Sequence, residues 1–390
     1  MTEFVEVVAE KMAAGGDAIA HAPDGRVLFV EGALPGERVR VELRVQKRDF
    51  LRGVVADVFE PSPHRTAPPC PEHARGCGGC AWQHIAPAEQ LALKTSVVAD
   101  ALRRTARLPD AEVRQGSAVS PWAYRTTLRL AVAGDGRVGL RAASSHRVVP
   151  LAGCDVAHPS LATLLPNLRV RGAAEVSVRV GDDGITLLPL DERGRPTKAQ
   201  CEGLATNVRV GATAAVHISV ASARLRVSAP SFFQSGPEAA GLLVHAVRDA
   251  CGDALASAPV FLDAYGGVGL FSAALDRPDA VLVESSPSAS ADARHNLPRA
   301  QIEEVPFERW EPRHIDLAVV DPARAGLGVG AAQVVAATNA ERIVLVSCDP
   351  VAMARDTALL VGHGYQHRSS VVLDLFPHTP HVEVVTVLDR

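Results

Sequence analysis

The sequence contains no long hydrophobic run. Of its 390 residues 47% are hydrophobic, yet no stretch approaches the roughly 20 consecutive apolar residues that cross a bilayer. The opening residues, MTEFVEVVAEKM, are acidic and lack the apolar core of a secretory signal peptide. These absences predict a cytoplasmic protein that has no membrane partner.

The sequence also has no excess of positive charge. It carries 40 Lys and Arg against 44 Asp and Glu, which gives a net charge of −4. Any contact with RNA or DNA therefore has to use a local basic surface. A cytosolic location disfavours disulfides, so the seven cysteines are expected to be ligands, nucleophiles or core residues.

Two common nucleotide-binding motifs are missing as well. The sequence has no P-loop lysine, and Gly266, Gly267 and Gly269 do not have the G-x-G-x-x-G spacing of dinucleotide-binding turns. These absences disfavour ATP and NAD as cofactors.

The first 60 residues consist of short β-rich runs separated by Gly and Pro turns. About five such strands predict a small β-barrel, a fold that often binds oligonucleotides. Basic residues cluster on and after one strand, and they predict either an RNA contact or a solvated charged edge. They are Arg38, Arg40, Arg44, Lys47, Arg48 and Arg52.

A Pro-rich linker, residues 61–69, leads into a central domain that we expect to span residues 61–229. It begins with a C-x6-C-x2-C motif formed by Cys70, Cys77 and Cys80, and Cys154 follows as a distant fourth thiol. Four thiols in this pattern match either a zinc site or an iron–sulfur cluster, and the spacing does not choose between them. Residues 87–107 predict a helix, and alternating runs between about 121 and 228 predict an antiparallel sheet.

After Pro230, strand and helix patterns alternate, which predicts a doubly wound α/β domain over residues 230–390. The first strand ends in Asp263 and a Gly-rich turn, and the next ends in Glu284. This arrangement favours S-adenosylmethionine, with the turn approaching the ligand and the acidic residue binding ribose hydroxyls. The alternative is a tight strand–helix turn without a ligand.

The run IVLVSCDP, residues 343–350, predicts a buried strand that ends at a helix N-terminus. Cys348 would then lie at the carboxyl end of a strand, where open α/β sheets place their chemistry. A helix N-terminus stabilises a thiolate, so Cys348 is a candidate nucleophile. A small buried cysteine is the alternative.

Six segments together resemble one family. They are SFFQSGPEAA, FLDAYGGVGLFS, VLVESSP, VVDPARAGLG, LVSCDPVAMARD and DLFPHTPHVE. In this order they resemble the S-adenosylmethionine-dependent RNA 5-methyluridine methyltransferases, which act on tRNA or rRNA. The resemblance covers nearly the whole chain. It implies a Rossmann-like class I methyltransferase domain, an N-terminal TRAM domain and a central domain that carries a 4Fe-4S cluster.

The resemblance also implies roles for individual residues. Cys348 matches the family's nucleophile and Glu383 its general base. The positions that match its S-adenosylmethionine contacts are Gln234, Tyr265, Glu284 and Asp321. The positions that match its cluster ligands are Cys70, Cys77, Cys80 and Cys154. A flipped-out base could pack against Phe232, Phe233 or Phe376, and we expect a monomer.

The chain departs from the family at three positions. Gly266 replaces the usual Cys, Ala323 the usual Pro, and Asp349 the usual Asn. The carboxylate of Asp349 is expected to raise the pKa of the neighbouring Cys348 thiol. Two rival functions are a methyltransferase with a non-RNA substrate and a non-catalytic RNA-binding protein with a vestigial methyltransferase domain.

Overall fold

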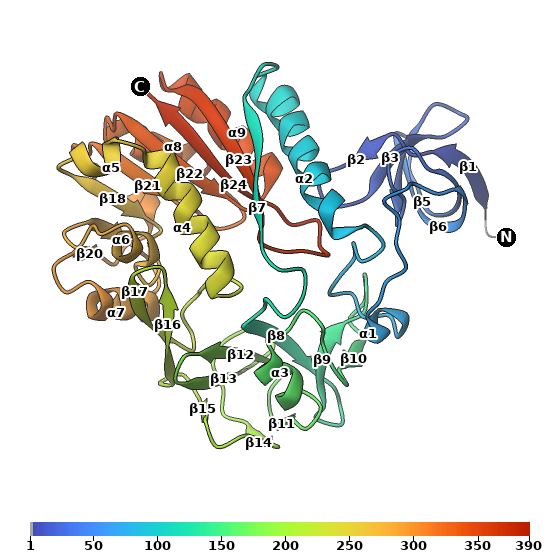
Figure 1. Ribbon diagram of the computed structural model, residues 1–390, viewed down its shortest axis with the longest axis horizontal. Helices are drawn as coiled ribbons and strands as arrows, with labels where there is room; N and C mark the ends of the chain where they lie inside the picture. The colour runs from blue at the N-terminus through green and yellow to red at the C-terminus, as the bar shows by residue number, and fades with distance from the viewer. Residues whose placement is uncertain (1–2) are drawn as a thin grey trace.

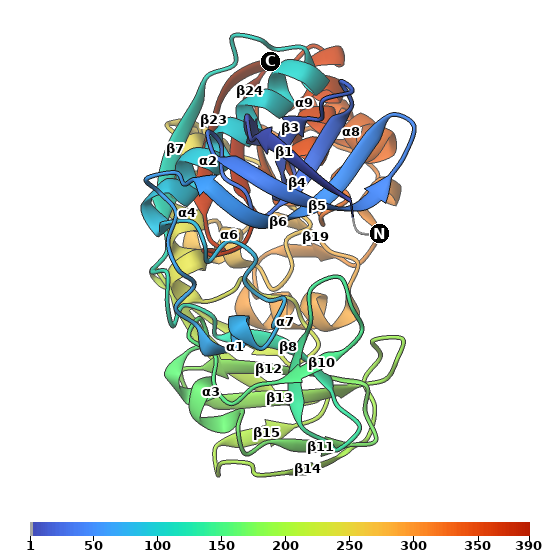
Figure 2. The same ribbon diagram turned by 90° about the vertical axis from the view of Figure 1, so that its right-hand side faces the viewer.

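The computed structural model describes residues 3–390 and shows three parts (Figure 1). The N-terminal strands lie to one side of the molecule in Figure 1 and face the viewer in Figure 2, the central strands lie below, and a large sheet flanked by helices forms the remainder. Within residues 3–390, no helix is long and apolar enough to cross a membrane.

The N-terminal part is a six-stranded sheet with the order β1-β5-β6-β4-β3-β2. All pairs are antiparallel except β4 with β6. On β5, Val39 and Val41 are buried while Arg38 and Arg40 are exposed, as the alternating sequence predicts. The strands are β1 (Phe4–Val8), β2 (Lys11–Met12), β3 (Ala18–His21), β4 (Val27–Glu31), β5 (Arg38–Gln46) and β6 (Phe50–Glu60).

The core of this sheet continues into the following segment. Trp82, Ile85, Leu93 and Val97 pack in the same apolar cluster as the strand residues. The segment contains α1 (Pro71–Ala74), α2 (Pro87–Ala101) and the π-helical turn η1 (Leu102–Ala106). The predicted helix over 87–107 is thus present, and Arg107 ends it in the left-handed conformation with φ 58°.

The central part is built on a sheet with the order β10-β9-β8-β12-β13-β15. It is antiparallel as predicted, except that β15 runs parallel to β13. Its elements are β8 (Thr127–Val132), β9 (Val138–Arg141), β10 (Val148–Pro150), α3 (Pro159–Leu164), β12 (Glu175–Gly181), β13 (Gly184–Leu190) and β15 (Val208–Val210). Two strand pairs stand outside this sheet: β11 (Arg169–Arg171) with β14 (Gln200–Glu202), and β16 (Ala215–Val220) with β17 (Ala223–Ser228).

The large sheet has eight strands in the order β20-β19-β18-β21-β22-β24-β23-β7. The strands from β20 to β22 are parallel, as the alternating pattern predicts, and β24 is antiparallel to both neighbours. The strands are β7 (Val113–Ala118), β18 (Phe261–Ala264), β19 (Val281–Val283), β20 (Gln301–Glu303), β21 (Leu317–Val320), β22 (Arg342–Ser347), β23 (Gln366–Asp374) and β24 (Glu383–Asp389).

Helices accompany these strands, and α4 and α9 contact the sheet directly. They are α4 (Pro237–Cys251), α5 (Ala254–Ser257), α6 (Leu270–Ala274), α7 (Pro287–Asn296), η2 (Phe307–Arg309), α8 (Gly328–Ala337) and α9 (Pro350–Gly362).

The edge of the large sheet does not coincide with the boundary expected at residue 230. Strand β7 pairs in parallel with β23, and α2 contacts β7, β23 and α9. In Figure 1, α2 and β7 accordingly lie against the C-terminal strands. The hairpin β16–β17 packs in the same apolar cluster as α4. Residues from the expected central domain therefore complete the C-terminal one.

Candidate active site

A pocket opens at the carboxyl end of the parallel strands, where β18 and β21 end. It brings together three of the predicted cofactor-binding residues, Gln234, Tyr265 and Asp321. The glycine turn after β18 and the aromatic pair before Gln234 complete its lining, which comprises Phe232, Phe233, Gly266, Gly267, Val268, Leu270 and Phe271. The predicted Gly-rich turn therefore lines a cavity and does more than connect a strand to a helix.

The fourth predicted cofactor residue, Glu284, lies beside this lining. One of its carboxylate oxygens accepts a hydrogen bond from the N–H of Gly267 at 3.0 Å, and the other accepts one from Ser286 at 2.6 Å. Tyr265 starts the turn with φ 60°, a conformation that is strained for a residue with a side chain. The glycine turn is thus held in a fixed shape next to an acidic side chain.

Asp321 lines the pocket, and the carboxyl of Asp263 lies close enough to influence its pKa. Asp263 is fully buried, and its Oδ2 accepts hydrogen bonds from the N–H and hydroxyl of Ser272 at 3.0 and 2.6 Å. Burial raises the pKa of Asp263 to about 6, and burial together with Asp263 raises the pKa of Asp321 to about 7. The carboxyl of Asp321 is therefore poised to become charged beside a positively charged ligand such as a sulfonium ion.

Cys348 and Glu383 lie at the same end of the sheet. Cys348 directly follows β22, and Glu383 begins β24, whose Val384 pairs with Ser347. Burial, then Glu383, then Asp321 raise the pKa of the Cys348 thiol to about 11. Burial and Asp321 raise the pKa of Glu383 well above its usual range. The candidate nucleophile and base thus interact with each other and with a residue of the cofactor pocket.

Asp349 does not act as the sequence suggested. Its Oδ1 caps α9 by accepting hydrogen bonds from the N–H groups of Val351 and Ala352 at 3.0 and 2.9 Å. Its other oxygen lies 3.8 Å from the guanidinium of Arg324. The expectation that Asp349 raises the pKa of Cys348 is therefore corrected, because the carboxylates responsible are those of Glu383 and Asp321.

The other two departures also have defined positions. Gly266 is packed so tightly that a Cβ atom would lie 2.5 Å from Cγ of Leu282. Ala323 is exposed in the loop after β21, and its carbonyl accepts a hydrogen bond from the N–H of Gly326 at 2.7 Å.

The three candidate aromatic residues lie in different environments. The side chain of Phe232 is 73% exposed, although it lines the cofactor pocket, whereas Phe233 is buried in the core. Phe376 lies between the edge of His381, 6.0 Å away, and the guanidinium of Arg125, 5.9 Å from its centroid. Of the three, Phe232 is thus exposed, Phe376 is half-buried and Phe233 is buried.

Sequence reasoning did not single out His381 or Arg125. Burial, Arg324 and Arg125 lower the pKa of His381 to about 4, so its ring is neutral at pH 7. Its place in DLFPHTPHVE, two residues before Glu383, was the signal that could have identified it. Arg125 carried no recognisable sequence signal, because its neighbours come from distant segments.

The four candidate cluster cysteines surround one small cavity. Cys70, Cys77, Cys80 and Cys154 all line it, and all seven cysteines of the chain are free thiols. The backbone of Cys77 forms an isolated antiparallel β-bridge with Ala142, which follows β9, so the cysteine loop is attached to the central sheet. Within the described residues, no group of three or more His, Cys, Asp or Glu is arranged to hold a metal ion, so the geometry supports neither the zinc site nor the iron–sulfur cluster over the other.

The basic cluster of the N-terminal sheet is largely paired with its own acidic residues. Salt bridges join Arg38 to Glu60, Arg40 to Asp57, Arg44 to Glu42 and Arg52 to Asp17. Arg48 is 97% exposed and lies 4.0 Å from Asp49. Because these arginines are exposed and an exposed ion pair contributes only about 0–1 kcal/mol, the pairs do not decide between an RNA contact and a solvated charged edge.

Comparison with protein families gives two matches. Residues 3–56 match the TRAM domain, and residues 296–390 match the family described as tRNA (Uracil-5-)-methyltransferase. The N-terminal sheet and the end of the chain that carries Cys348 and Glu383 are thus recognised separately.

Individual relatives match the chain over its whole length. An uncharacterized RNA methyltransferase from Streptomyces coelicolor is 36% identical over 99% of this chain and 93% of its own length. The 23S rRNA (uracil(1939)-C(5))-methyltransferase of Alkalilimnicola ehrlichii is 32% identical over 100% of this chain and 97% of its own length. Among solved structures, the Pyrococcus abyssi tRNA (uracil-54, C5)-methyltransferase with S-adenosyl-L-homocysteine has a TM-score of 0.72 at 23% identity, over 98% of this chain and 99% of its own.

Proposed function

The chain belongs to the family of S-adenosylmethionine-dependent RNA (uracil-5-)-methyltransferases, and from this premise we propose that Cys348 is its nucleophile and Glu383 its general base. We propose further that Gln234, Tyr265, Glu284 and Asp321 bind S-adenosylmethionine. The observation that carries the proposal is that Asp321, Cys348 and Glu383 lie at the same end of the sheet, where the paired strands β21 and β22 end and β24 begins. The reaction is the transfer of a methyl group to C5 of a uridine in RNA.

The chemistry explains why a thiol and a carboxylate are needed together. C5 of uracil is a poor nucleophile until Sγ of Cys348 adds to C6, which turns the ring into an enolate. C5 then attacks the methyl carbon of the sulfonium, and the bond between that carbon and sulfur breaks to release S-adenosylhomocysteine. Glu383 removes the proton from C5, and the C6–S bond breaks to restore the ring and the thiolate.

The electrostatics of the site suit this order of events. The raised pKa of Glu383 makes its carboxylate a stronger base once it has lost its own proton. The carboxylate of Asp321, which lines the pocket, attracts the sulfonium ion but does not favour the uncharged thioether of the product. Binding of the cation also opposes the carboxylates that hold the thiol of Cys348 protonated.

We propose 23S ribosomal RNA as the substrate. Relatives from Alkalilimnicola ehrlichii, Aeromonas hydrophila and Methylococcus capsulatus, which are 30–32% identical over nearly the whole chain, carry the name 23S rRNA (uracil(1939)-C(5))-methyltransferase. The target base has to leave its stack to reach the pocket, so we expect a uridine in a loop or an unpaired strand. Transfer RNA is the second candidate, since the matched family is described by that substrate.

The test of function uses RNA from cells that lack the gene. Purified protein is incubated with total RNA and methyl-labelled S-adenosylmethionine, and the digested rRNA and tRNA fractions are analysed for labelled 5-methyluridine. We expect label in the rRNA fraction and none with Cys348→Ala. Label in another nucleoside would refute the uracil assignment, and label in tRNA alone would refute the rRNA proposal. S-adenosylmethionine binding without any label would support a non-catalytic RNA-binding protein.

We propose that Cys70, Cys77, Cys80 and Cys154 hold a 4Fe-4S cluster. The cavity that these four thiols share supports the proposal, because four Cys thiolates are the usual ligands of such a cluster. Such a cluster would tie the cysteine loop to the turn after β10, and methyl transfer by polar addition needs no electron from it. Anaerobic purification followed by iron and sulfide analysis tests this proposal, with Cys154→Ser expected to lose the metal and its visible absorbance.

A further inference from the structure

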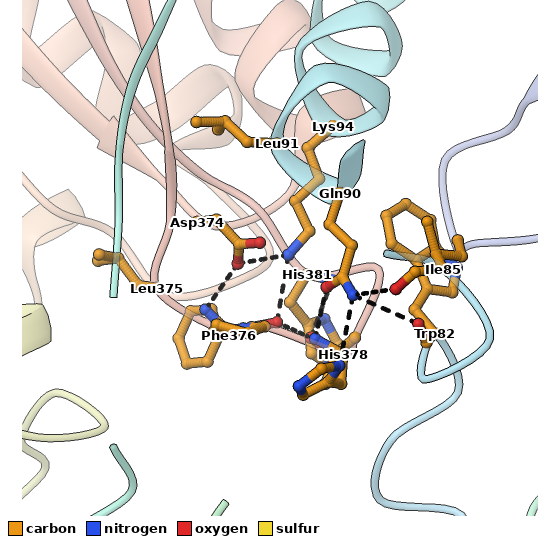
Figure 3. A network of polar contacts seen from close by, with 12 residues as sticks. Trp82, Ile85, Gln90, Leu91, Lys94, Asp374, Leu375, Phe376, His378 and His381 are labelled. Carbon is orange, nitrogen blue, oxygen red and sulfur yellow. Dashed lines mark hydrogen bonds and ion pairs between the residues drawn. The ribbon is translucent and has the colours of Figure 1, made fainter. Parts of the chain in front are cut away.

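Helix α2 holds the loop that leads into Glu383. Residues 375–382 connect β23 to β24. Lys94 of α2 contacts the start of this loop, and its side chain is fully buried (Figure 3). Nζ of Lys94 donates hydrogen bonds to Oδ1 of Asp374 at 2.6 Å and to the carbonyl of Phe376 at 3.1 Å. Oδ1 of Asp374 also accepts from the N–H of Phe376 at 3.1 Å, so the start of the loop is closed into a ring of hydrogen bonds.

One helical turn earlier, Gln90 holds the middle of the same loop. Its Oε1 accepts a hydrogen bond from the N–H of His378 at 2.6 Å, and its Nε2 donates to the carbonyl of Ile85 at 2.9 Å. The carbonyl of His378 accepts from the N–H of Trp82 at 2.8 Å. The N–H of His378 is thus held by Gln90 of α2, and its carbonyl is held by Trp82, which lies just before α2. Figure 3 shows these residues together.

The opposite face of the loop is also held. The ring of Trp122 stacks on His378 with centroids 4.1 Å apart, and the hydroxyl of Tyr124 donates to the carbonyl of Pro377 at 3.3 Å. The hydroxyl of Ser235, next to Gln234 of the cofactor pocket, donates to the carbonyl of Leu375 at 3.3 Å. The loop therefore has little freedom to move before the chain reaches Glu383.

Burying a charged pair is an inefficient way to stabilise a fold. Removing a lysine and a carboxylate from water costs several kcal/mol, and apolar residues of similar size often serve stability equally well. Such a pair does specify geometry, because one arrangement alone satisfies its charges and hydrogen bonds. The geometry specified here is the path of the chain between two residues that border the active site, Phe376 and Glu383.

We propose that Lys94 and Gln90 are positioning residues for proton abstraction, which hold residues 375–382 so that Glu383 reaches the proton on C5. This inference rests on the proposed role of Glu383 as the base. It predicts a specific kinetic defect, since methyl transfer precedes proton abstraction. Loosening the loop should leave S-adenosylmethionine binding and attack by Cys348 intact while slowing the release of RNA from the thiol.

The test compares three variants with one control. Gln90→Met removes the contacts to His378, Lys94→Met removes the cation, and Lys94→Met/Asp374→Asn removes both charges while keeping an oxygen for the N–H of Phe376. The control is Arg342→Met, which removes the salt bridge to Asp389 at the far end of β24. Each protein is measured for kcat, KM for RNA, affinity for S-adenosylmethionine and covalent protein–RNA adduct that survives denaturation.

We expect kcat to fall at least about tenfold in Gln90→Met and in the double variant, with cofactor affinity within about twofold of the wild type. We also expect adduct to accumulate on ordinary RNA. The control Arg342→Met should leave both kcat and the amount of adduct unchanged. If Lys94→Met does not fold, the other two variants decide the question.

Two outcomes would overturn the proposal. One is a folded Gln90→Met and double variant with kcat within about twofold of the wild type. The other is a parallel loss of cofactor binding and activity that Arg342→Met also shows, since this would indicate a merely structural role. The role of Glu383 as the base is tested separately, by measuring adduct and turnover in Glu383→Gln. A failure of that assignment is therefore distinguishable from a failure of the positioning role.

Discussion

Val384 lies opposite Ser347 in the antiparallel pairing of β24 with β22. Because β24 runs against the parallel strands, its first residue, Glu383, arrives at the end of the sheet where Cys348 follows β22. A parallel strand in this place would have put the carboxylate at the other edge. The reversed direction of one strand thus brings together two residues that are 35 positions apart in the sequence.

The pair predicts opposite results for two variants. Cys348→Ala should abolish both methylation and covalent RNA binding, because no other group adds to C6. Glu383→Gln should still form the C6–S bond and transfer the methyl group but should fail to remove the C5 proton, so that methylated RNA stays attached to the protein. Denaturing gels with labelled RNA measure the adduct. A Glu383→Gln protein that turns over normally and releases free 5-methyluridine would remove Glu383 from the mechanism.

The carboxyl of Asp321 in the cofactor pocket predicts that the affinity for S-adenosylmethionine depends on pH. The pKa of Asp321 is raised to about 7, and a bound sulfonium cation favours the charged carboxylate, so the affinity should rise as the pH increases through this value and then level off. S-adenosylhomocysteine lacks the cation and should show a weaker dependence. Asp321→Asn should bind S-adenosylmethionine more weakly and with a flatter pH profile. Titration calorimetry at several pH values checks this, and equal profiles for both ligands would contradict it.

The Asp349 departure predicts little effect when it is reversed. Asn caps a helix about as well as Asp, and the exposed contact with Arg324 contributes little. Asp349→Asn should therefore change the free energy of unfolding by less than about 1 kcal/mol and kcat by no more than about twofold. Asp349→Ala, which loses the cap, should cost about 1 kcal/mol. Site-resolved alkylation of Cys348 provides the check, since a much faster reaction in Asp349→Asn would restore Asp349 as the cause of the raised thiol pKa.

The sequence alone was sufficient where a local pattern carries the signal. The strand–turn motifs predicted that the glycine turn, Glu284 and Cys348 would lie at strand ends, and the structure places them there. Strand β7 was not predicted in the C-terminal sheet, because its partner β23 lies some 250 residues away and no local pattern specifies such a pairing. The sequence also did not predict that the Asp349 carboxylate caps α9. Adjacency in sequence does not decide whether a carboxylate faces the neighbouring thiol or caps a helix.

The buried contact between Lys94 and Asp374 is a further example. The two residues are 280 positions apart, and a lysine within an amphipathic helix pattern is ordinarily assigned to the solvated face. Its burial depends on how α2 packs against β23, which is a tertiary property. Residues placed by long-range packing, such as Lys94, could therefore be identified only from the structure, whereas residues on local motifs could be identified from the sequence.

The tight packing at Gly266 predicts that restoring the family's usual cysteine is harmful in this chain. The added Cβ would lie 2.5 Å from Cγ of Leu282 and 3.0 Å from Cγ of Asp263. Forcing extra atoms into a packed site typically costs about 1–3 kcal/mol, and the shift would disturb the turn that lines the cofactor pocket. We therefore expect Gly266→Cys to lower the thermal unfolding midpoint and to weaken S-adenosylmethionine binding.

Combining this change with Leu282→Ala separates the clash from other causes. If the collision is responsible, the double variant should bind the cofactor better than Gly266→Cys alone, and the two substitutions should be less damaging together than the sum of their separate effects. Strict additivity would show that Leu282 is not the obstacle.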